Sequence, residues 1–148
     1  MFYTTLAQAH AVALVAALVF FVLAEILILG ARGGRHMLAR AALLVGDAGG
    51  LLAGLGVLGG IALVAIGPWP LLSSWLLASF ALMAILLAVG RVLVSPWENR
   101  WKAAVRAGSS TEIAALSVER RALFGRATMI ALFVLIMVVM SAKPTLFH

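Results

Sequence analysis

The sequence of 148 residues contains no cysteine. Such a chain forms no disulfide, no catalytic thiolate and no cysteine-ligated iron–sulfur cluster from its own residues. Charge is scarce as well, because charged residues make up 11% of the chain and only 5 residues are acidic. The chemistry of this protein must therefore depend on apolar contacts and on a few individual polar side chains.

Hydrophobic residues supply 65% of the sequence, and the mean hydropathy is +1.17. A soluble domain is nearer to half apolar and a quarter charged. A chain of this length forms one domain, and the core of one soluble domain does not absorb so much apolar sequence. The composition predicts a protein that lies in a lipid bilayer.

Four apolar segments are long enough to cross a bilayer, which takes roughly 20 residues of helix; they cover about 6–29, 41–66, 71–94 and 123–142. Between the second and third segments, Gly67, Pro68 and Pro70 end one helix before the next begins, and Trp69 suits the membrane interface. The sequence predicts an all-α fold: a single domain over 1–148 that forms an up-down bundle of four transmembrane helices.

The net charge of +6 is concentrated in two connections. The tail after the fourth segment carries only Lys143, whereas the first and third connections carry Arg32, Arg35, Arg40, Arg100, Lys102, Arg106, Arg120 and Arg121. Because basic loops stay in the cytoplasm, we predict a multi-pass protein of the bacterial inner membrane with both termini on the periplasmic side. The same placement favours contact with lipid head groups, and we expect no nucleic-acid partner.

The third connection, about 96–121, is predicted to lie on the cytoplasmic membrane surface. Trp97 and Trp101 stand among charged residues there, as in interfacial segments. After a break at Gly108-Ser109, residues 111–121 have the pattern of a short amphipathic helix, capped by Ser110 or Thr111 and ending near Arg120 and Arg121.

Each predicted spanning segment holds one charged residue near its cytoplasmic end: Glu25, Asp47, Arg91 and Arg126. At about 1.5 Å of rise per residue, all four lie within one or two turns of the same membrane layer. An unpaired carboxylate at membrane depth costs roughly 2.5–3.5 kcal/mol. We therefore predict a buried polar cluster of these four side chains that ties the bundle together. The alternative is a proton or ion relay.

Glycines recur in the second segment at a spacing of four, at Gly46, Gly50 and Gly54 and again at Gly56 and Gly60. Small residues at this spacing let helix backbones approach closely. The pattern predicts that the second helix is the central or most tightly packed one. It also predicts that this helix can face other membrane subunits or a second copy of the chain.

His10 is the one histidine within a predicted spanning segment. A histidine in a membrane can ligate haem or another metal centre, or pass protons; it can also simply bond to a neighbouring helix, for which Gln8, Ser73, Ser74, Ser79 and Ser141 are candidates. A haem held by two histidines needs a second imidazole, and no other spanning segment supplies one. Met129, Met137 and Met140 follow a spacing that is typical of packing.

Several short motifs resemble the bacterial integral-membrane family of unknown function numbered 2269. The segments 54–60, 67–71 and 74–79 carry the resemblance, the Lys143-Pro144 ending is similar to the finish of that family, and His10 falls where its members have a histidine. That family is distantly similar to the CopD-type copper-resistance membrane domain and the HemJ-type protoporphyrinogen oxidase. The resemblance to the HemJ type implies haem b on His10. The HemJ type has a lysine in its third helix where this chain has Ser79, which counts against the oxidase activity.

Three functional hypotheses follow. The first, which we favour, is a non-catalytic accessory subunit or assembly factor that docks in a larger membrane complex. The second is a haem- or tetrapyrrole-binding membrane protein in which His10 is an axial ligand. The third is a small proton-coupled transporter that uses Glu25 and Asp47.

Overall fold

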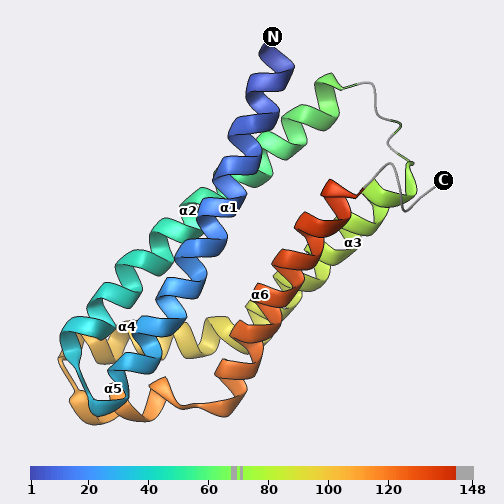
Figure 1. Ribbon diagram of the computed structural model, residues 1–148. Coiled ribbons are helices and arrows are strands. Elements are labelled where there is room, and N and C mark those ends of the chain that lie inside the picture. Colours follow the sequence, from blue (N-terminus) through green and yellow to red (C-terminus); the bar gives the residue numbers. More distant parts are fainter. Residues whose placement is uncertain (68–69, 71, 143–148) are drawn as a thin grey trace.

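The computed structural model describes residues 1–67, 70 and 72–142, and it is all-helical over these residues (Figure 1). Four stretches are long and apolar enough to cross a membrane: Phe2–Gly33, His36–Ile66, Ser74–Ala107 and Arg120–Ser141. The predicted all-α fold with four membrane-spanning helices is confirmed. Pro68 and Trp69 of the predicted hairpin, and the Lys143-Pro144 ending, lie outside the described residues.

Over the described residues, six α-helices, one short 3₁₀ turn and one π-helical turn follow one another. They are α1 (Phe2–Gly30), η1 (Ala31–Gly33), α2 (His36–Ile66), α3 (Ser74–Val89), η2 (Gly90–Val94), α4 (Ser95–Ala107), α5 (Ser110–Ser117) and α6 (Arg120–Ser141). The first connection is shorter than predicted because α2 begins at His36 and includes Arg40. Gly34, with φ of +71°, makes the turn between η1 and α2, since glycine adopts this left-handed conformation without strain.

The four long helices form two pairs, α1 with α2 and α3 with α6 (Figure 1). The α1–α2 interface is the most extensive in the molecule, and α1 also contacts α6. In the described part of the chain, α2 and α3 share no comparable interface. The second helix was predicted to be the central or the most tightly packed one. It is not central, because α1 lies between α2 and α6 and α2 has one side without a described helix against it, but its packing on α1 is the closest of the helix pairs.

The third connection differs from the prediction in its details. The helix of α3 continues through a π-helical turn at Gly90–Val94 into α4, and a π-turn is a common cause of a sharp bend. After this bend α4 runs across the base of the two helix pairs (Figure 1). Its four buried residues are Trp97, Trp101, Ala104 and Val105, which share one face of the helix. The amphipathic helix beneath the bundle is thus α4.

A second helix, α5, completes the base. Gly108, with φ of +67°, ends α4, and the hydroxyl of Ser109 caps α5 by accepting a bond of 3.4 Å from the Glu112 N–H. The cap is therefore Ser109 and neither Ser110 nor Thr111. The helix ends at Ser117, and Arg120 and Arg121 belong to the first turn of α6.

The buried side chains form two apolar clusters at different heights. The lower cluster joins α4 and α5 to the ends of α1, α2 and α6, with Ile28, Ala39, Trp97, Trp101, Ile113 and Ala122 among its members. The upper cluster lies between α1, α3 and α6 and consists of Leu14, Ala17, Leu86, Phe133 and Ile136. Figure 1 shows the N-terminus and the end of α6 at the opposite end of the molecule from this base.

Candidate functional site

Glu25 of α1 and Arg126 of α6 meet above the base, as predicted. The Nε–H of Arg126 donates to Glu25 Oε1 at 2.6 Å, and the side chains are 7% and 18% exposed respectively. The guanidinium also lies 4.0 Å from the centre of the Trp97 ring, a cation–π contact that strengthens when water is excluded. One ion pair and one aromatic face therefore join α1, α4 and α6.

Asp47 does not enter this cluster, which corrects the prediction. Its side chain is 67% exposed, and its nearest cation is Lys102 of α4, with Nζ 3.7 Å from Oδ1. The same ammonium group contacts Glu98 at 2.6 Å. The physical reason is the course of α4, which passes beneath α2 and brings a lysine within reach. The carboxylate of Asp47 is thus compensated at the edge of the base.

Arg91 does not enter the cluster either. It lies in the π-helical turn η2 with an exposed side chain, so the prediction that it pairs with Glu25 or Asp47 is wrong. A long arginine near the end of a spanning helix can extend its charged group to the membrane interface. Depth alone therefore does not bring the four charged residues together; the helix face matters as well.

The predicted glycine set divides into two faces of α2. Gly56 packs so closely on α1 that a Cβ at this position would lie 2.5 Å from Leu14 Cδ2, and a Cβ at Gly46 would lie 3.9 Å from that of Ala24. Gly60 faces His10, because a Cβ added at Gly60 would lie 3.0 Å from Cε1 of the His10 ring. In contrast, a Cβ at Gly50 or Gly54 would meet no heavy atom within 4 Å. Gly50 and Gly54 are therefore on a face that no described residue covers.

That uncovered face borders a groove of about 930 Å³ between α2 and α3, which we call the α2–α3 groove. Its α2 wall includes Asp47, Gly50, Leu51, Gly54, Leu55 and Leu58. Its α3 and α6 wall includes Met83, Leu86, Leu87, Met129, Ile130 and Phe133. Its floor is polar and aromatic and consists of Glu25, Trp97, Glu98, Trp101 and Arg126. The volume is within the usual range of about 300–1,000 Å³ for ligand sites.

Three hydrogen-bond donors at this floor lack partners among the described residues. They are Nη1 and Nη2 of Arg126 and Nε1 of Trp101, and each is screened from solvent. By comparison, Nε1 of the neighbouring Trp97 donates to the Leu116 carbonyl at 2.9 Å. A buried donor without an acceptor costs about 1–3 kcal/mol, and more for a charged group. Arg126 and Trp101, which both line the groove, thus hold buried donors without acceptors among the described residues.

The floor residues Trp97, Glu98 and Trp101 were not predicted as site residues, nor was Lys102, which contacts Asp47 and Glu98. The sequence signal was present in the two tryptophans set among charges, and that pattern equally describes a helix on a membrane surface. The sequence does not show the bend at η2, which turns α4 so that Trp97 lies under Arg126.

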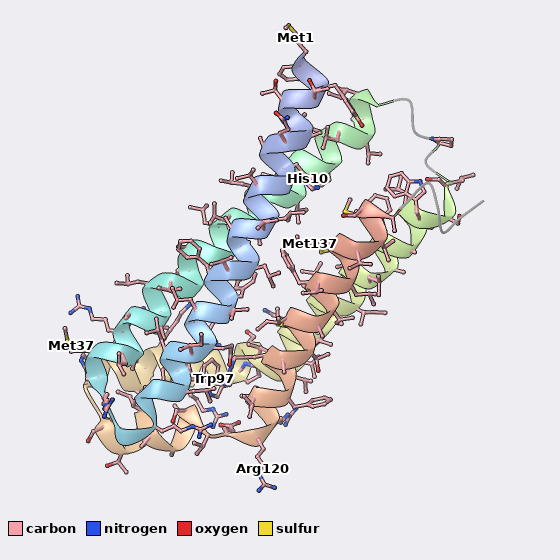
Figure 2. All side chains as sticks on the ribbon, viewed as in Figure 1. Met1, His10, Met37, Trp97, Arg120 and Met137 are labelled. Carbon is pink, nitrogen blue, oxygen red and sulfur yellow. The ribbon has the colours of Figure 1, made fainter. Side chains whose placement is uncertain are left out.

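His10 lies far from this floor, toward the N-terminal end of α1, whereas Trp97 is at the base (Figure 2). Its Nδ1 is 2.7 Å from the Gly56 carbonyl oxygen, so Nδ1 carries the proton and Nε2 is the acceptor in the neutral ring. A cavity of about 300 Å³ beside it is lined by Trp75, Met137 and Met140, among others. In residues 1–67, 70 and 72–142, no three His, Cys, Asp or Glu side chains gather as metal ligands would.

The arrangement at His10 fits haem only in part. The bond from Nδ1 to Gly56 leaves Nε2 available as one axial ligand. His36, the other described histidine, lies at the base, where its Nε2 bonds to the Val105 carbonyl at 2.7 Å. Ser79 bonds within its own helix, from Oγ to the Trp75 carbonyl at 2.8 Å. The described residues thus provide one histidine ligand without a second.

Comparisons of the chain with protein-family models, with curated proteins and with solved structures find no match.

Proposed function

We propose that this protein is a non-catalytic accessory subunit or assembly factor, and that a transmembrane helix of its partner packs into the α2–α3 groove. The supporting observation is that α2 and α3 do not pack against each other in the described part of the chain. Among the described helices, α1–α2, α3–α6 and α1–α6 pack on one another, whereas α2 and α3 border an open groove. Gly50 and Gly54 on its wall are four residues apart and uncovered, which is the pattern that lets a second backbone approach closely.

The setting of this proposal is the bacterial inner membrane, with both termini on the periplasmic side. The basic first connection and the helices α4 and α5 lie at one end of the molecule, and the N-terminus lies at the other (Figure 1). The positive-inside rule places the basic end in the cytoplasm.

The two other hypotheses have less support. Haem on His10 requires a second ligand that the described residues do not place beside it. Proton transport through Glu25 and Asp47 requires carboxylates that exchange protons along one path. Glu25 is instead held by Arg126, while Asp47 contacts Lys102 at the edge of the base. These contacts favour a structural role for both carboxylates.

Photo-crosslinking in the native membrane tests the docking proposal. We expect a photoreactive side chain at Leu58, which lines the groove and is 64% exposed, to give one discrete protein adduct. The same probe at Val19 of α1, which is 58% exposed outside the groove, should give lipid adducts alone. Gly54→Leu should abolish the Leu58 adduct, because its side chain fills the space that the partner backbone needs.

The partner is identified by mass spectrometry of the adduct. An adduct with another membrane protein supports an accessory subunit, and an adduct of twice the mass of this chain identifies a second copy as the partner. Lipid adducts alone from both Leu58 and Val19 would contradict the proposal.

A further inference from the structure

A basic corner lies where the turn between α1 and α2 meets the junction of α4 and α5. Nε2 of His36 is 2.7 Å from the Val105 carbonyl oxygen. Gly34 packs so closely that a Cβ added there would lie 2.7 Å from the Ser110 carbonyl oxygen. These two contacts hold the segments together. Four exposed arginines lie in these segments, and we call them the corner arginines: Arg32, Arg35, Arg40 and Arg106.

The fold brings the corner arginines together from separate parts of the sequence. Arg35 precedes His36 and Arg106 follows Val105, so the hydrogen bond between His36 and Val105 places both arginines at one corner. Arg40 is four residues after His36, on the same face of α2. Arg32 belongs to η1, which packs on α5. The charges of three helical segments thus meet at the base of the molecule.

The corner arginines form no ion pair with any described residue. The chain has 5 acidic residues, and four of them form ion pairs with other cations: Glu25, Asp47, Glu98 and Glu119. The fifth, Glu112, is exposed in the first turn of α5. Even if its charge is set against the four corner arginines, the corner keeps a positive excess. An anionic ligand would balance this charge.

The surface beside the corner favours a ligand that is anionic at one end and apolar at the other. Arginine suits phosphate, because its fork of N–H donors pairs with two phosphate oxygens. On α2, Met37 and Leu44 are 78% and 66% exposed, and Arg40 lies between them on the same face, at steps of three and four residues. Figure 2 shows Met37 on the outer side of α2 at the base. A phospholipid has acyl chains to cover this apolar strip, whereas a free phosphate has none.

We propose that the corner arginines bind the phosphate of an anionic phospholipid, whose acyl chains lie along Met37 and Leu44 of α2. A zwitterionic phospholipid carries its own cation, so it leaves the positive excess of the corner unbalanced, whereas an anionic one neutralises it. The site shares no residue with the α2–α3 groove. The inference therefore does not depend on the proposed partner helix.

Lipid binding is measured by native mass spectrometry of the purified full chain, released from mild detergent after titration with one phospholipid. We expect phosphatidylglycerol to bind more tightly than phosphatidylcholine with the same acyl chains. Arg35→Gln with Arg106→Gln should raise the Kd for phosphatidylglycerol about 30-fold, because each arginine near a lipid surface contributes about fivefold. Arg120→Gln with Arg121→Gln removes the same charge from exposed arginines in the first turn of α6, and it should leave this Kd nearly unchanged.

Three results would overturn the inference. Equal affinity of the wild-type chain for phosphatidylglycerol and phosphatidylcholine would show that the corner does not select anionic lipid, and this comparison needs no variant. Equal losses in the two double variants would show that binding follows total charge and not the corner arginines. Displacement of phosphatidylglycerol by inorganic phosphate at the same concentration would assign the corner to a free phosphate. Absence of the Leu58 photo-adduct, in contrast, would contradict the docking proposal and leave these lipid measurements unchanged.

Discussion

We expect Arg126→Ala to lower the free energy of unfolding of the purified protein by about 3–5 kcal/mol, the usual range for a buried ion pair that loses one partner. The Glu25 carboxylate, 18% exposed, would lose the donor that now lies 2.6 Å away. Trp97 would lose the guanidinium that covers its ring at 4.0 Å. The change is measured by titration with a denaturing detergent, followed by loss of helical circular dichroism.

Two matched variants at the same membrane level serve as controls. Asp47→Ala should change the free energy of unfolding by no more than about 1 kcal/mol, because its side chain is 67% exposed and its contact to Lys102 is 3.7 Å long. Arg91→Ala, at an exposed arginine, should also have little effect. Equal losses in all three variants would contradict the assignment of the structural ion pair to Glu25 and Arg126.

A double variant separates the broken ion pair from lost packing. Glu25→Gln with Arg126→Gln removes both charges and leaves no buried carboxylate alone. Replacing both members of a buried pair is much less costly than removing one. The double variant should therefore be more stable than Arg126→Ala. If it is no more stable, the loss comes from packing against Trp97.

The second large effect is expected at Gly56. A Leu side chain there must displace Leu14, since the first added carbon already lies 2.5 Å from Leu14 Cδ2. Leu14 is 8% exposed within the upper apolar cluster, so it has little room to move. We expect Gly56→Leu to lower the free energy of unfolding by about 1–3 kcal/mol, the range for overpacking, or to separate α1 from α2.

Gly50→Leu and Gly54→Leu are the matched controls, because no described atom lies within 4 Å of a Cβ at either position. Both should leave stability unchanged or raise it by up to about 1 kcal/mol, as expected when Leu replaces Gly in a helix. The same detergent titration applies. If Gly54→Leu destabilises the isolated chain as much as Gly56→Leu, the two glycines do not lie on different faces and the division of α2 is wrong.

The spanning helices were predictable, because a sufficiently long apolar run is stable in a bilayer as a helix. The contact between Glu25 and Arg126 was predictable from their similar depth in the membrane. Depth does not specify which side of a helix a residue occupies, which is why Asp47 and Arg91 were placed incorrectly. Lys102 was not predicted as the partner of Asp47, because the short distance between them depends on the π-turn at Gly90–Val94. An apolar sequence carries no pattern that predicts such a turn.

The glycine spacing in α2 likewise did not specify which face of the helix each glycine occupies. A spacing of four residues drifts around a helix of 3.6 residues per turn, so Gly46, Gly50 and Gly54 do not remain on one face. The glycines of α2 that contact α1 are Gly46, Gly49, Gly56, Gly59 and Gly60, and their separations of three, four and seven residues fit the period of about 3.5 residues of helices that pack side by side. The residues that leave this seam, Gly50 and Gly54, are the ones that border the groove.

The open groove between α2 and α3 is tested most directly with cysteine pairs, because the chain has no cysteine of its own. Ala24→Cys with Gly46→Cys is the positive control: the two Cβ positions are 3.9 Å apart, which suits a disulfide. In lipid nanodiscs that contain the purified protein alone, this pair should oxidise fully. Gly50→Cys or Gly54→Cys combined with Met83→Cys or Leu87→Cys, across the groove, should remain reduced. Disulfide formation across the groove at the rate of the control pair would show that α2 and α3 pack together, and it would contradict the account.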